Sequence, residues 1–121
     1  MTTTLRDRLV ASMMRLATAT ARRETALRAF VASEPGPARD ALEAPIADLL
    51  EACIEADVDL HDALYAWATQ GAEGIDALAP QAAAWLAAER DPRGNPHACF
   101  DAFEALRDAA LDHAATVAAV N

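Results

Sequence analysis

Apolar residues recur every three or four positions along most of the chain, a spacing that places their side chains on one face of an α-helix. The clearest case is the segment 4–32, whose apolar positions are Leu5, Leu9, Met13, Leu16, Leu27, Phe30 and Val31. We expect one helix here, about 43 Å long at 1.5 Å per residue. It ends before Pro35-Gly36-Pro37, because proline cannot continue the backbone hydrogen bonds.

The same spacing predicts further helices over 45–56, 59–70, 80–90 and 96–120. Pro45, Pro80 and Pro96 suit the first position of a helix, and Asn95 suits the cap of the last one. A break at 57–59 is favoured because a continuous helix would place Asp57 in the apolar stripe, where an unpaired carboxylate is costly. The last helix is expected to bury Phe100, Phe103, Leu106, Ala110, Leu111, Ala114 and Val117.

No segment alternates apolar and polar residues in the manner of a strand, so the 121 residues predict one all-α domain, an antiparallel bundle of four to five helices. Alanine supplies 33 of the hydrophobic residues. It favours helix and lets helices approach closely, but it contributes little apolar area. We therefore expect a second copy of the chain to cover part of one face, which would make the protein a homodimer.

Ten arginines and no lysine stand against 19 acidic residues, for a net charge of −9. Such a surface repels nucleic acid and phospholipid and attracts a basic partner. We find no secretory signal and no apolar stretch of the length that a membrane span needs. The lone cysteines Cys53 and Cys99 fit a reduced state. A cytoplasmic protein is expected, and the alanine- and arginine-rich composition is typical of a GC-rich, bacterial coding sequence.

Two rows of charge are the candidate partner-binding residues. The acidic row lies on the last helix and consists of Asp101, Glu104, Asp108 and Asp112; the basic row, spaced by seven, consists of Arg8, Arg15 and Arg22. The alternative is that both rows are solvated outer faces with weak internal ion pairs. Arg23 falls within the apolar stripe of its helix, and either pairs with Asp57 or lies beyond the bundle.

Asp57, Asp59, His61 and Asp62 are candidate metal ligands, since carboxylates and imidazole both bind divalent cations. The spacing matches no EF-hand or HExxH motif, and acids at a helix start also serve as caps, so we favour Asp59 as a cap with Asp62 in the first turn. No metal or cofactor is predicted. Nor does any serine, glycine or cysteine motif support catalysis.

These features favour a non-enzymatic protein–protein interaction module for a basic or helical partner. It would act as an inhibitor or immunity protein that masks a basic enzyme surface, or as an adaptor or chaperone for a helical segment. One alternative is a bundle that binds a small molecule or metal near His61, Tyr65, Trp67 and Trp85. Another is a structural subunit of a larger assembly.

Overall fold

The computed structural model of the chain describes residues 4–120, in which every regular element is helical. In chain order the elements are α1 (Leu5–Ala32), α2 (Pro37–Asp40), α3 (Glu43–Thr69), the 3-10 turn η1 (Asp76–Leu78), α4 (Ala79–Arg90) and α5 (Pro96–Val120). The all-α class expected from the sequence is therefore confirmed. None of these helices combines the length and the apolar character needed to cross a lipid bilayer.

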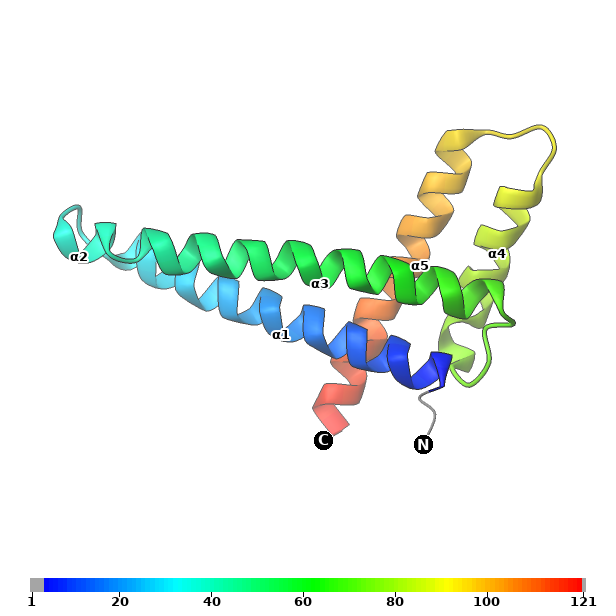
Figure 1. Ribbon diagram of the computed structural model, residues 1–121, viewed down its shortest axis with the longest axis horizontal. Coiled ribbons are helices and arrows are strands. Elements are labelled where there is room, and N and C mark those ends of the chain that lie inside the picture. Colours follow the sequence, from blue (N-terminus) through cyan, green and yellow to red (C-terminus); the bar gives the residue numbers. More distant parts are fainter. Residues whose placement is uncertain (1–3, 121) are drawn as a thin grey trace.

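The long helices form two hairpins that cross at one end of the molecule (Figure 1). α1 and α3 run antiparallel and pack against each other, with α2 in the turn that joins them. α4 and α5 form the second hairpin, which packs on the N-terminal part of α1 and the C-terminal part of α3. The rest of the first hairpin, residues 17–55, projects beyond this crossing, and we call it the arm.

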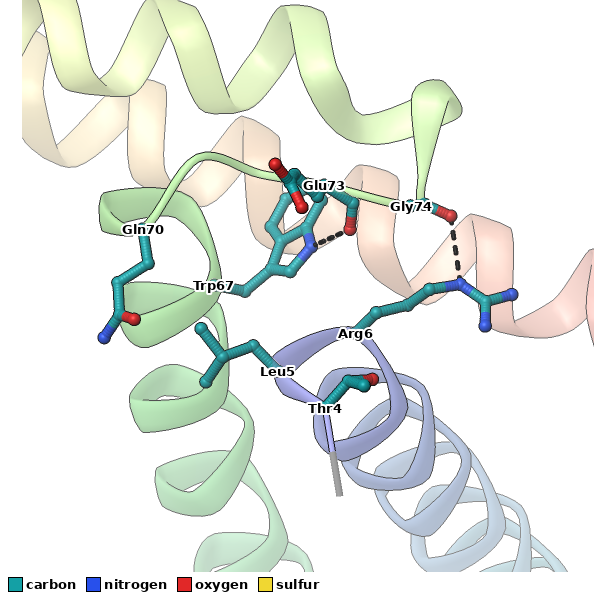
Figure 2. Close-up of a pocket in the computed structure, with 7 residues that line it drawn as sticks. All are labelled: Thr4, Leu5, Arg6, Trp67, Gln70, Glu73 and Gly74. Atoms are coloured by element: carbon teal, nitrogen blue, oxygen red, sulfur yellow. Dashed lines mark hydrogen bonds between the residues drawn. The ribbon is translucent and has the colours of Figure 1, made fainter. Parts of the chain in front are cut away.

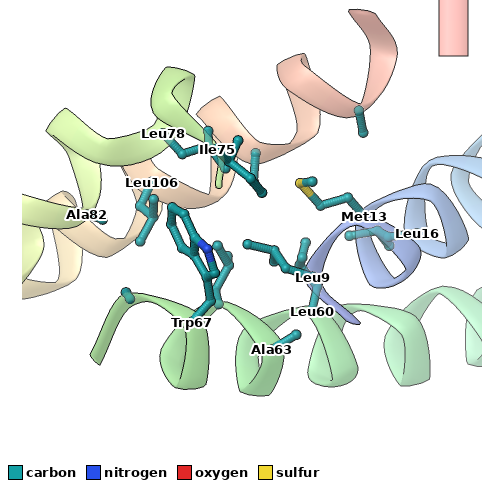
Figure 3. Close-up of a cluster of buried hydrophobic side chains, with 14 of the residues drawn as sticks. Leu9, Met13, Leu16, Leu60, Ala63, Trp67, Ile75, Leu78, Ala82 and Leu106 are labelled. Atoms are coloured by element: carbon teal, nitrogen blue, oxygen red, sulfur yellow. The ribbon is translucent and has the colours of Figure 1, made fainter. Parts of the chain in front are cut away.

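The hydrophobic core lies at the crossing (Figure 3). Its largest fully buried side chains come from α1, α3, η1 and α5. They are Leu9, Met13, Leu60, Leu64, Trp67, Leu78 and Leu106. Alanines fill the space between them, each at most 1% exposed: Ala56, Ala63, Ala68, Ala82, Ala110 and Ala114. Because the distance between packed helices depends on the side chains at the contact, these methyl groups let the two hairpins approach closely.

α3 runs without interruption from Glu43 to Thr69, so the expected break at 57–59 and the two separate helices are wrong. Asp57 avoids the cost of burial because Arg107 of α5 pairs with it and its side chain stays 47% exposed. Asp59 is not a cap: its Oδ2 accepts a hydrogen bond of 2.8 Å from Ser12 Oγ. Asp62 lies on the exposed side of the same helix.

Side chains cap the N-terminal ends of α1 and α5. Thr4 Oγ1 accepts a 3.0 Å hydrogen bond from the Asp7 N–H at the start of α1. Asn95 Oδ1 accepts a 3.0 Å hydrogen bond from the His97 N–H, which confirms the cap expected for α5. Pro45 was expected at the first position of its helix. α3 instead begins two residues earlier, at Glu43, and Pro45 lies within its first turn.

Candidate functional site

An open groove with several aromatic side chains in its lining lies where α3 meets the α4–α5 hairpin. Its volume is about 730 Å³. Three helices line it, with Asp57, His61 and Tyr65 from α3, Trp85 and Glu89 from α4, and Pro96, Cys99, Phe100, Phe103, Glu104 and Arg107 from α5. We call this the aromatic groove. It is the strongest candidate site, because it gathers four of the six Phe, Trp and Tyr side chains of the chain, together with His61.

Helical spacing explains why each element presents these side chains together. Asp57, His61 and Tyr65 are four residues apart on α3, so they lie on one face, and Trp85 and Glu89 repeat that spacing on α4. The lining residues of α5 follow one another at intervals of three and one, so they lie on one side of that helix. The uninterrupted course of α3 is essential here, since a break at 57–59 would turn Asp57 away from His61 and Tyr65.

Four rings form a continuous chain along the groove. The His61 ring lies 4.5 Å from that of Phe103, measured between centroids. Phe103 lies 5.3 Å from Trp85, and Trp85 lies 5.5 Å from Tyr65, both pairs in edge-on geometry. Such contacts stabilise rings beyond their burial, so this surface is preorganised.

Two rings of the groove are unusually open to solvent. Phe100 is 68% exposed and Tyr65 is 47% exposed, whereas Trp85 is only 4% exposed. Cys99 lines the groove as a half-buried free thiol. Exposed aromatic side chains that adjoin a buried ring make the apolar, solvent-accessible surface at which proteins bind partners.

The charges of the groove leave it acidic. Arg107 Nε donates a 2.8 Å hydrogen bond to Asp57 Oδ1, and Arg107 Nη2 donates to the same oxygen, so these two charges neutralise each other. Glu89 and Glu104 lie at the rim, and within residues 4–120 neither takes part in an ion pair. The groove therefore has an apolar floor and a negative rim.

The predicted acidic row of α5 is exposed at all four of its residues: Asp101, Glu104, Asp108 and Asp112. Of these only Glu104 also lines the aromatic groove. The other three lie farther round α5, at positions that the helical period turns away from Phe103. The row is thus an outer face of the molecule that touches the groove at one residue.

The predicted basic row lies on another side of the molecule. Arg8, Arg15 and Arg22 are exposed on α1, and Arg15 Nη1 lies 3.8 Å from Asp59 Oδ2 of α3. Arg23 does not pair with Asp57. It lies half-buried in the arm, and its buried Nε makes no hydrogen bond within the described residues.

The four candidate metal ligands point in different directions. Asp57 pairs with α5, Asp59 contacts Ser12 and Arg15 of α1, and His61 stacks on Phe103. In residues 4–120 no group of three histidine, cysteine or acidic side chains is placed to hold a metal ion. The proximity of these residues in sequence therefore does not become a cluster in space.

The proposed tryptophan pocket is divided between two places. Trp85 is in the aromatic groove, while Trp67 lies in the core beside a smaller cavity of about 390 Å³. Figure 2 shows that cavity at the start of α1, where Trp67 Nε1 donates to Glu73 O at 2.8 Å and Arg6 Nε donates to Gly74 O at 3.0 Å. These hydrogen bonds hold the loop after α3, so we assign this cavity a structural role.

Sequence reasoning missed the α5 side of the groove. Phe100 was expected in the buried face of the last helix, and it is instead 68% exposed. Phe100, Phe103 and Arg107 share one face at helical spacing, which is a signal for a shared site. The spacing alone does not identify the site, because only the crossing of the hairpins determines which part of α5 is left uncovered.

The groove is suited to binding, since its rings attract apolar groups and its rim attracts cations. Comparison with known proteins finds no match to this chain among protein-family models, curated proteins or solved structures. The geometry and charge of the aromatic groove are therefore the observations that bear on function.

Proposed function

We propose that this protein is a protein-binding module whose aromatic groove receives the apolar side of a basic, amphipathic helix from another protein. The observation that carries this proposal is a preorganised apolar floor with an acidic rim. Exposed Phe100 and Tyr65 supply apolar contact area, and Glu89 and Glu104 supply charge at the rim. Of the two protein-binding modes expected from the sequence, this is the one for a helical segment.

The dimensions of the groove support a helical occupant. Its lining on α5 extends from Pro96 to Arg107, about 16 Å or three helical turns. A groove of this kind binds an amphipathic helix through side chains spaced three and four residues apart. Because the groove is open to solvent on one side, it leaves the polar face of such a helix in water.

The charge of the groove supports a basic occupant. The charges of Asp57 and Arg107 neutralise each other. Glu89 and Glu104 can therefore attract the arginine or lysine side chains that flank the apolar stripe of a partner. The net charge of −9 favours the approach of such a partner over long distances. An acidic helix would be repelled by the same residues.

A titration calorimetry experiment with synthetic peptides tests the proposal. The probe is a helical peptide of about four turns with leucines along one face and arginines on the other. We expect it to bind, whereas a peptide of scrambled order and one with glutamate in place of arginine should not. Failure of the arginine peptide to bind would contradict the proposal.

Substitution of Phe100 distinguishes binding in the groove from non-specific electrostatic attraction of the basic peptide to the acidic protein. Burying its ring contributes on the order of 2 kcal/mol, so Phe100→Ala should raise the Kd of the arginine peptide about thirtyfold. Val31→Ala, at a similarly exposed apolar residue of the arm, is the control and should leave the Kd unchanged. Equal effects of the two substitutions would place binding elsewhere.

A pair of charge variants distinguishes the groove rim from the outer acidic row. Glu89→Gln with Glu104→Gln should weaken binding of the arginine peptide and make its Kd depend less on salt concentration. Asp108→Asn with Asp112→Asn removes the same charge from the outer face of α5 and should have a much smaller effect. If the outer pair has the larger effect, the mode is that of an inhibitor that binds through the acidic row, and the groove proposal is wrong.

A small apolar molecule is the second candidate occupant. The groove volume of about 730 Å³ falls within the roughly 300–1,000 Å³ typical of ligand pockets. The near-buried Trp85 ring makes its fluorescence a reporter of either occupant. A metabolite that changes this fluorescence and displaces the arginine peptide would favour a small-molecule site.

A further inference from the structure

Phe100 is a ring of the aromatic groove that the other rings leave uncovered. It is 68% exposed, and within residues 4–120 it makes no ring–ring contact, whereas the other four rings of the groove form the continuous chain described above. Phe100 lies on α5 three residues before Phe103 and on the same side of that helix. The groove therefore presents a largely uncovered phenyl ring beside a floor of packed rings.

Two carboxylates adjoin this ring. Glu104 follows Phe100 by four residues on α5, so the two side chains are neighbours on the helix surface, with roughly 5–6 Å between their Cβ atoms. Glu89 adjoins the ring from α4. Trp85 contacts Phe103, and because α4 and α5 run antiparallel (Figure 1), the next turn of α4 lies level with the preceding turn of α5. Phe100 therefore lies between one carboxylate on its own helix and one on the neighbouring helix.

The groove has an arginine of its own, but that side chain is held elsewhere. Arg107 lies about one turn from both Phe103 and Glu104 on α5, near enough to interact with either. Its Nε and Nη2 instead both donate to Asp57 Oδ1, and within residues 4–120 no arginine side chain lies over a ring of the groove. Asp57 thereby leaves Glu104 and the Phe100 ring accessible to a cation from another molecule.

A contact in the arm shows how a phenyl ring of this chain binds a cation. Arg39 Cζ, from α2, lies 4.4 Å from the centre of the Phe30 ring of α1. The buried Arg39 Nε makes no hydrogen bond within the described residues, so the ring is the contact that offsets its loss of water.

The combination of a phenyl ring with carboxylates favours arginine over lysine. A guanidinium group is planar and weakly hydrated, so it can stack on a ring while its edge donates hydrogen bonds to a carboxylate. A lysine ammonium group is a compact charge that holds its water more strongly. The two groups carry the same charge, so the difference between them isolates the contribution of the ring.

Resting on the function proposed above, we propose that the aromatic groove selects arginine over lysine in its partner. One arginine beside the apolar stripe of the partner helix lies across the Phe100 ring and donates hydrogen bonds to Glu104 or Glu89. Its methylene stem covers the adjoining apolar surface of the groove. The partner is therefore an amphipathic helix that carries arginine, and not merely positive charge, next to its apolar face.

Calorimetric titration with two peptides of equal charge tests this proposal. The arginine peptide described above is compared with the same sequence carrying lysine at every arginine position, so that length, apolar stripe and net charge are unchanged. The lysine peptide should bind with a Kd about tenfold higher.

A substitution that removes only the ring identifies the source of this preference. Phe100→Leu keeps an apolar side chain in the groove, and it should raise the Kd of the arginine peptide to near that of the lysine peptide. Phe30→Leu, the same change at a ring outside the groove, is the matched control and should retain the tenfold preference. Circular dichroism checks that both variants keep the helical fold.

The outcomes separate this inference from the function on which it rests. Equal affinity of the two peptides for the wild-type chain, or a preference that Phe100→Leu does not reduce, would overturn the arginine site and leave the groove as a site for any basic amphipathic helix. If neither peptide binds the wild-type chain, the proposed function and the arginine site are both wrong.

Discussion

At the scale of single residues, Gly74 carries the tightest constraint in the loop after α3. Its φ of +90° lies in the region that side chains disfavour, and an added Cβ would collide with the Arg6 side chain. That side chain is held in place by the 3.0 Å hydrogen bond from Arg6 Nε to Gly74 O. The loop and the start of α1 are therefore locked to each other at this glycine.

Replacing Gly74 by alanine should lower the free energy of unfolding by about 1–3 kcal/mol, since it adds backbone strain and displaces Arg6. Gly94→Ala is the matched control, because Gly94 also has a positive φ, of +37°, but has open space around it. It should cost about 1 kcal/mol from backbone strain alone, and so less than Gly74→Ala. Urea denaturation measures both, and equal losses would show that the contact with Arg6 contributes nothing.

Asp57 shows what residue-level reasoning from the sequence lacks. The cost of an unpaired buried carboxylate is real, and it led to a predicted break in the helix. The pairing residue, Arg107, is 50 positions away, and no local pattern connects the two. Asn95, by contrast, was correctly predicted as a cap because capping depends only on its immediate neighbours.

At the scale of elements, α3 passes through two environments. Near its C-terminal end it lies in the core, where Leu60 is fully buried, and in the arm the chemically identical Leu50 is 45% exposed. The two leucines are ten residues apart on one uninterrupted helix. Their stability effects therefore report packing alone.

Leu60→Ala should destabilise the monomer by about 2–5 kcal/mol because it opens a cavity in the core. Leu50→Ala should cost about 0.5 kcal/mol or less, if measured at a concentration low enough to keep the chain monomeric. Both values come from chemical denaturation. A large loss from Leu50→Ala under those conditions would mean that the arm has a core of its own.

Element boundaries followed from the sequence where local signals mark them. The predicted first helix begins one residue before α1, and the predicted 96–120 matches α5, because proline clusters, Asn95 and apolar spacing mark these ends. Which face of α5 would be covered did not follow. Leu106, Ala110 and Ala114 are buried as expected, but Phe100 extends past the crossing and is exposed.

At the scale of the whole molecule, the aromatic groove and the poorly covered arm both result from the crossing of unequal hairpins. The aromatic groove lies in the corner between α3 and the α4–α5 hairpin, and the arm is the part of the longer hairpin that the shorter one leaves uncovered (Figure 1). Composition and charge indicated an acidic, alanine-packed all-α protein. They could not indicate the groove, since it depends on where two hairpins cross.

The most direct measurement of the central claim is a map of amide chemical shifts of the isotope-labelled chain as the arginine peptide is added. We expect the largest shifts to cluster at 57–65, 85–89 and 96–107, with the indole N–H of Trp85 among them. Shifts centred on Asp108 and Asp112 or on the arm, or no shifts at all, would contradict it.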